Sequence, residues 1–115
     1  MLLIYQGSTP LPPSDEWEAL SDDQKQGVYR AYQEINETAG VQPGLGLQPA
    51  DSATTVTVAD GKTLVTDGPF VGVKEAIGGY LVLEADDLDA AIALAGKIPA
   101  ASMGGAIEIR PIAEW

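Results

Sequence analysis

The chain has 115 residues, of which 17 are Asp or Glu and six are Lys or Arg, and its formal net charge is −11. Nucleic-acid affinity comes largely from Lys and Arg side chains that neutralise phosphates, so this acidity argues against a nucleic-acid partner and against an anionic membrane surface. The chain contains neither Cys nor His, which excludes disulfides and thiolate chemistry and removes the commonest metal ligands. We therefore expect no metal site and no cofactor.

Length and hydropathy predict a single cytoplasmic domain over residues 1–115. One core of modest size can form at this length. No apolar run approaches the ~20 residues that a membrane-spanning helix needs. The opening segment, MLLIYQGSTP, is too short for a signal peptide and lacks the basic flank of one.

Hydrophobic periodicity and turn residues divide the chain into strands and helices. Asp60-Gly61 lies between two extended runs and predicts a two-residue β-hairpin, while Ser21 and Gln24 have the spacing of a capping box. In chain order we expect a strand at 2–5, a helical turn at 17–20, a helix at 22–39 stopped by Gly40, a short extended piece at 45–47, strands at 54–59 and 62–66, a strand at 79–85, a helix from Asp86 or Asp87 that Pro99 ends, and an edge strand at 106–112.

This order predicts an α+β fold. It is a ferredoxin-like βαββαβ unit with an antiparallel sheet and a β-hairpin inserted at its middle. In the last helix, Leu88, Ala91, Ile92 and Ala95 recur at helical spacing and are expected to share one apolar face.

The two strands expected at the centre of the sheet are apolar on both faces. Leu2 and Ile4 alternate with Leu3 and Tyr5, and residues 80–83 repeat the pattern. Two helices cover only one face, and a bare second face would exceed the apolar patch that monomers usually expose. We therefore expect a second copy to pack sheet to sheet as a homodimer. The alternative is that the inserted hairpin and the C-terminal tail fold over this face.

The segment 63–80, TLVTDGPFVGVKEAIGGY, holds the main candidates for a site. Asp67-Gly68-Pro69 is typical of a turn, after which Phe70 would fill the core. Asp67 and Glu75 are the candidates for a catalytic base, a role that requires burial of the carboxylate. Glu75 is either solvent-facing or held in a pocket by a cation.

Three other side chains complete the candidate ligand-binding set. Arg110 is the best available cation, or else it pairs with Glu108 or Glu84. Tyr5 and Tyr80 offer hydroxyls to a ligand, or are core aromatics with a satisfied tip. The full set is Tyr5, Asp67, Phe70, Glu75, Tyr80 and Arg110.

Several of these segments together resemble the DGPF (DGPFAETKE) subgroup of the YCII-related proteins. The resemblance rests on Asp60–Phe70, Lys74-Glu75, Gly78–Tyr80, and also on 1–5, 46–49, 86–91 and 108–111. It implies a bacterial protein that pairs into a dimeric α+β barrel, in a family whose biochemical role is poorly defined. Genes of this subgroup often lie beside those of extracytoplasmic-function sigma factors, and the wider superfamily includes isomerases and monooxygenases. Here Met103 stands where many members carry a His.

Three functions remain open at this stage. The first is a homodimer that binds a small molecule in its barrel interior and has a sigma factor as its regulatory partner. The second is a cofactor-free enzyme, isomerase- or monooxygenase-like, that acts on a small cyclic substrate with a carboxylate base. The third is a purely structural dimer. The lack of His and Cys favours the first, because a carboxylate base near neutral pH needs strong desolvation.

Overall fold

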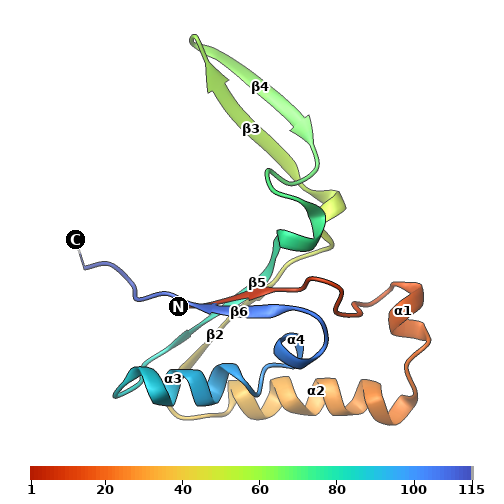
Figure 1. The fold of residues 1–115 in the computed structure, drawn as a ribbon, viewed down its shortest axis with the longest axis vertical. Helices are drawn as coiled ribbons and strands as arrows, with labels where there is room; N and C mark the ends of the chain where they lie inside the picture. Colours follow the sequence, from red (N-terminus) through yellow and green to blue (C-terminus); the bar gives the residue numbers. More distant parts are fainter. Residues whose placement is uncertain (115) are drawn as a thin grey trace.

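The computed structural model describes residues 1–114, with every side chain except that of Lys74. Figure 1 shows the fold. The elements, in chain order, are β1 (Leu2–Tyr5), α1 (Asp15–Glu18), α2 (Asp22–Asn36), β2 (Val41–Gly46), the 3-10 turn η1 (Ala50–Ser52), β3 (Thr54–Ala59), β4 (Lys62–Asp67), the 3-10 turn η2 (Val73–Glu75), β5 (Ile77–Leu83), α3 (Leu88–Ala95), α4 (Pro99–Ser102) and β6 (Ala106–Ile109).

Four strands form the main sheet in the order β2-β5-β1-β6, and every neighbouring pair is antiparallel. Without the inserted hairpin, the chain runs strand, helix, strand, strand, helix, strand, and the third strand of this series lies beside the first. The predicted ferredoxin-like α+β fold is therefore confirmed. The predicted edge strand at 106–112 is confirmed as an outer strand, but it is shorter than predicted, because β6 ends at Ile109, before Pro111.

The hairpin β3–β4 is a separate two-stranded sheet, which we call the arm (residues 54–67). Its strands join through Asp60 and Gly61, whose φ angles of 51° and 73° are both positive, as a type I′ turn requires. The predicted hairpin is thus confirmed. Gly61 accepts this φ without strain because it has no Cβ.

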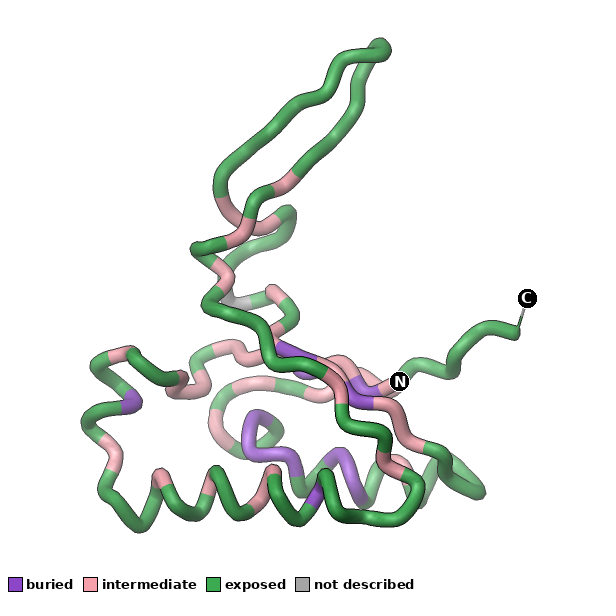
Figure 2. The backbone as a smooth tube through the Cα atoms, turned by 180° about the vertical axis from the view of Figure 1, so that it is seen from behind, coloured by how far each residue is buried: buried purple, intermediate pink, exposed green. Residues whose placement is uncertain are grey.

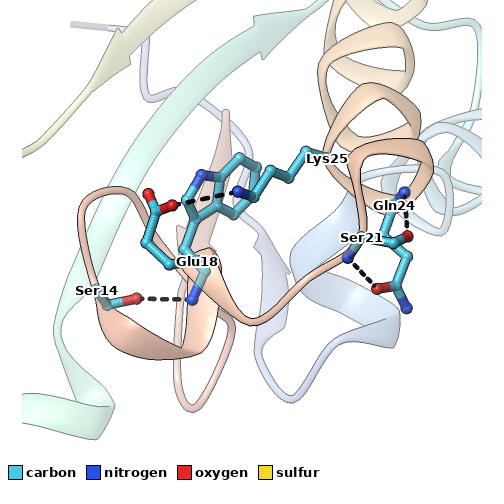
Figure 3. Close-up of polar contacts among 6 residues, drawn as sticks. Ser14, Glu18, Ser21, Gln24 and Lys25 are labelled. Carbon is cyan, nitrogen blue, oxygen red and sulfur yellow. Dashed lines mark hydrogen bonds and ion pairs between the residues drawn. The ribbon is translucent and has the colours of Figure 1, made fainter.

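Local hydrogen bonds mark the starts of the first two helices (Figure 3): α2 begins at Asp22 as predicted, whereas α1 begins at Asp15, two residues before the predicted turn at 17–20. The hydroxyl of Ser14 accepts from the Trp17 N–H at the start of α1. Ser21 and Gln24 form a reciprocal capping box at the start of α2, with bonds of 2.8 and 3.1 Å. An ion pair of 3.3 Å between Lys25 and Glu18 then joins the two helices.

The helices cover one face of the main sheet and enclose the core (Figure 2). Leu2 lies opposite Leu81 on one side and Ile109 on the other, so one face of the central strands points toward the helices. The buried core cluster comprises Leu2, Ile4, Ile35, Leu81, Leu94, Ala95, Ile98 and Ala100. Burial of this cluster stabilises the helix layer on the sheet.

The second helical region differs from the prediction in two ways. Pro99 was expected to end the helix, but α3 ends at Ala95 and Pro99 is in the first turn of α4, a position where a missing N–H costs nothing. The predicted apolar face is also wrong in part. Leu88 and Ile92 are exposed, whereas Leu94 and Ala95 are buried, because α3 turns its 94–95 side toward the core that Ile98 completes.

The first long helix is shorter than predicted. It ends at Asn36, and a turn then follows in which the Thr38 N–H bonds to Ile35 O and the Val41 N–H bonds to Thr38 O. Gly40 has a φ of +87°, and a Cβ there would lie 2.5 Å from the Glu84 carbonyl oxygen. This glycine therefore permits the close approach of the turn to the chain beyond β5, rather than stopping the helix itself.

The other face of the main sheet has no helix on it, and we call it the open face. The strand registers place Leu3 opposite Tyr80 and Glu108, and Gln42 opposite Val82. The open face therefore carries Leu3, Tyr5, Tyr80, Val82 and Glu108, all half-buried, together with the exposed Gln42.

The arm and the tail leave the open face uncovered. The arm rises on the side of the sheet opposite the helices and points away from the body, while residues 110–114 run outward from β6 (Figures 1 and 2). Residues 110–114 are all exposed. The alternative that these two segments fold over the face is therefore wrong for the described chain. Within residues 1–114, no helix combines the length and the apolar character that crossing a bilayer requires.

Candidate functional site

A groove of about 530 Å³ lies where the arm joins the body. One wall is the segment after β2, another is the loop after β4, and a third is the segment that leads into β5, and Tyr5 of β1 also lines the groove. The lining residues are Tyr5, Leu47, Gln48, Pro49, Ala50, Ser52, Ala53, Pro69, Phe70, Val71, Glu75, Ala76 and Ile77. Most of these side chains are apolar.

Turn hydrogen bonds hold the walls of the groove together. The Gly68 N–H donates to the Ala53 carbonyl at 2.7 Å. The Thr55 hydroxyl donates to the Gly68 carbonyl at 2.6 Å. Gly68 has a φ of +99°, which confirms the expected turn around Asp67-Gly68-Pro69. The DGPF segment therefore closes a turn and, through Pro69 and Phe70, also forms a wall of the groove.

The structure brings together three of the six predicted ligand-binding residues. Tyr5, Phe70 and Glu75 come from different parts of the chain and line the same groove. Phe70 does not fill the core, as the sequence led us to expect; its side chain is 83% exposed. The physical reason is that the loop after β4 stands away from the main sheet, whose helix-facing side is already packed by residues such as Leu2 and Ile98.

The other three predicted residues lie elsewhere. Tyr80 borders a second cavity of about 330 Å³, near the irregular part of β2. Asp67 is exposed at the end of β4, opposite Thr54. Arg110 forms an ion pair with Glu108, one of the two partners considered for it, and not with Glu75.

The second cavity contains a tyrosine that sequence reasoning did not select. Tyr32 of α2 borders it, together with Asn36, Gln6 and Tyr80. Burial raises the pKa of the Tyr32 hydroxyl above its ordinary value. The Gln6 Oε1 atom is buried with no hydrogen-bond partner in the described chain.

Sequence reasoning also missed the wall of the groove between β2 and β3. Leu47, Pro49 and Ala53 contribute to it, yet they belong to no regular strand or long helix. The one available signal was Gly46-Leu47-Gln48-Pro49, a segment that carries part of the family resemblance.

The two carboxylates considered as bases are both exposed in the single chain. A carboxylate becomes an effective base near neutral pH only when it is desolvated, so the chain alone does not provide that environment. Glu75 is the better placed of the two because it lines the groove. Among the side chains that the structure describes, no group of three or more Asp or Glu residues is arranged to hold a metal ion.

The fold defines the class of this protein. It is an antiparallel α+β domain with one bare sheet face and a groove beside that face. Residues 14–115 match the family model of the YCII-related domain. The chain is also 33% identical over 87 residues to an uncharacterised protein of Rhizobium meliloti (strain 1021), an alignment that covers 75% of this chain and 68% of that protein. The chain belongs to the YCII-related family.

Proposed function

We propose that this protein is a homodimer that binds a small, mainly apolar molecule in the groove at the base of the arm. The observation that carries the proposal is the continuity of the groove with the open face. Tyr5 and Ile77 line the groove and are also opposite each other in the β1–β5 register. A second copy seated on the open face would therefore enclose this groove within the interior of a dimeric barrel.

The size and lining of the groove support a small ligand. Ligand pockets commonly occupy about 300–1,000 Å³ and combine apolar walls with a few polar groups, and the groove measures about 530 Å³. Its ionisable polar groups are the Tyr5 hydroxyl and the Glu75 carboxylate. We therefore propose a ligand with an apolar body and a hydrogen-bond donor or a positive charge at one end. A chain of net charge −11 would repel an anionic ligand.

The subgroup and the regulatory partner are further proposals. Asp67–Phe70 and Lys74-Glu75 support membership of the DGPF subgroup. In that subgroup an extracytoplasmic-function sigma factor is the candidate partner. This partnership rests on the resemblance alone and does not depend on the groove.

A binding experiment with a neutral fluorescent probe tests the groove. We expect N-phenyl-1-naphthylamine to bind the protein with enhanced fluorescence and at one site per chain. Ala76→Trp should abolish this binding because the indole would fill the groove that Ala76 lines. Ala101→Trp is the matched control, since Ala101 is exposed on α4 and lies outside the groove. Equal probe binding by both variants would refute the groove as the ligand site.

The catalytic alternative has one supporting observation, the position of Glu75 in the groove wall. Dimerisation would bury this side chain further and so desolvate it. Titration of Glu75 by NMR in the assembled protein separates the two functions. An ordinary carboxyl titration would leave the enzyme without its base, whereas titration near neutral pH would favour catalysis over simple binding.

A further inference from the structure

We infer that the arm of each copy packs along the body of the second copy, with Val56, Val58 and Val65 as its contact surface. This inference rests on the proposed homodimer, but goes beyond it, because sheet-to-sheet packing alone leaves the arm without a role.

The chain exposes more surface than a folded monomer of the same mass normally does. The chain exposes 8066 Å², whereas a folded monomer of its mass, 12.0 kDa, is expected to expose about 6,000 Å². The excess is about 2,000 Å² per chain. Obligate homodimers bury a total of about 2,000–5,000 Å² over both copies, so a second copy of this chain is an occupant of the right size.

The overall shape leads to the same conclusion. The radius of gyration is 16.0 Å, against about 13 Å for a compact domain of this length. The arm causes much of this difference because it extends alone from the end of the body (Figure 1). An isolated two-stranded hairpin is marginally stable in water and normally needs a packing partner.

The side chains of the arm identify which of its faces needs that partner. Directly paired residues share a face, and the register pairs Val56 with Val65 and Val58 with Thr63. The face with the three valines is the more apolar of the two, with Thr54 and Asp67 at its base and Thr63 near its tip, and the valine side chains are between 58% and 67% exposed. The opposite face has Leu64 opposite Thr57 and Lys62 opposite Ala59, and is more polar. We call the first of these the valine face.

The position of the arm favours a second copy over an unrelated partner. The arm rises on the same side of the sheet as the open face, opposite the helices (Figures 1 and 2). A copy that covers the open face would therefore lie beside the arm, and the two-fold axis would place the partner's arm beside the first body. The valine face and the open face would then form one continuous interface.

Site-specific cross-linking tests the inference, and the chain suits this method because it contains no native cysteine. Thr63→Cys, near the tip of the arm and opposite Val58 on the valine face, is labelled with benzophenone-maleimide and irradiated in the full-length protein. We expect a cross-linked species of twice the 12.0 kDa mass, with the cross-link mapping to the body of the other chain. Arg30→Cys is the control. It is exposed on α2, in the helix layer, and should give no such species.

The outcomes separate this inference from the proposed function. A protein that sediments as a dimer, but gives no cross-link from position 63, would overturn the inference and leave the sheet-to-sheet dimer standing. A protein that sediments as a monomer at micromolar concentration would overturn both. Because the sample contains only this protein, a cross-linked species of twice the chain mass must join two copies of the chain.

A pair of substitutions checks the assigned face. Val65→Thr combined with Val56→Thr keeps the shape and the strand preference of both residues and should raise the dimer dissociation constant by about tenfold or more. Leu64→Thr alters the neighbouring residue on the opposite face and should change that constant by less than about twofold. A larger effect from Leu64→Thr than from the valine pair would overturn the assignment.

Discussion

Leu2 and Leu3 are adjacent in β1 but point to opposite faces of the sheet, and their truncation distinguishes a core face from an interface. Leu2 is 1% exposed, in the core beneath the helices. A buried Leu→Ala substitution costs about 2–5 kcal/mol, so Leu2→Ala should lower the free energy of unfolding by about 3 kcal/mol. Because Leu2 faces away from the proposed interface, the dissociation constant of the folded dimer should stay within about twofold.

Leu3→Ala should have the complementary effect. Leu3 is half-buried on the open face, so a second copy could cover only the exposed remainder of its side chain. We estimate that this remainder contributes about 0.5–1 kcal/mol per copy, since full burial of a leucine contributes about 1.5–3 kcal/mol. Two-fold symmetry doubles the effect, and the total of about 1–2 kcal/mol corresponds to about a tenfold weaker dimer.

Two measurements on each variant show whether the open face is an interface between two copies. Sedimentation equilibrium gives the dimer dissociation constant, and urea unfolding followed by circular dichroism at one protein concentration gives the stability. If Leu3→Ala lowered stability as much as Leu2→Ala without weakening association, the open face would be no interface and the reasoning would fail.

Two further predictions concern α2. Ser21→Ala removes one half of the capping box and should lower the free energy of unfolding by about 1 kcal/mol in urea denaturation. Gln26→Ala, at an exposed position inside α2, is the control and should change this free energy little. No loss from Ser21→Ala would show that the cap does not stabilise the helix. Burial raises the pKa of Tyr32, so its contribution to stability should be full below the unfolded value near pH 10 and be lost as pH rises through the higher folded value. The difference in stability between the wild-type protein and Tyr32→Phe should therefore shift against the wild type above pH 10, and a constant difference from pH 8 to pH 12 would contradict the cause assigned to this shift.

Short-range sequence signals predicted most of the fold, because each of them depends on residues only a few positions apart. Asp60-Gly61 defined the hairpin through its preference for positive φ, and Ser21 with Gln24 defined the start of α2 through their reciprocal bonds. The faces of β1 followed from simple alternation. The family followed from the DGPF segment and its neighbours, and the match over residues 14–115 confirms it at the level of the YCII-related domain.

Features set by tertiary packing were not predictable in the same way. Helical spacing showed that Leu88 and Ile92 share a face, but it could not show that α3 would turn its Leu94 side to the core instead. Phe70 was expected in the core because it is large and apolar. The structure places it in a groove wall, since the direction of the arm decides where the loop after β4 lies. That direction depends on contacts outside the segment itself.

Only part of the candidate site could be predicted, because its position also depends on tertiary packing. Glu75 and Tyr5 were selected as polar groups near apolar strands, and both line the groove. Arg110 was selected as the best available cation for the site, but the structure shows the stated alternative, an ion pair with Glu108. Leu47 was predicted only as the end of a short extended piece at 45–47, and Pro49 carried no periodic signal, so the wall they form was visible only in the structure.

The mass of the purified protein in solution tests the central claim most directly. We predict that sedimentation velocity at micromolar concentration will show a single species of twice the 12.0 kDa chain mass, because the open face and the arm together leave about 2,000 Å² more surface exposed than a monomer of this size should have. A single species of one chain mass over the same concentration range would contradict the account, since the open face would then be stable in water without a partner.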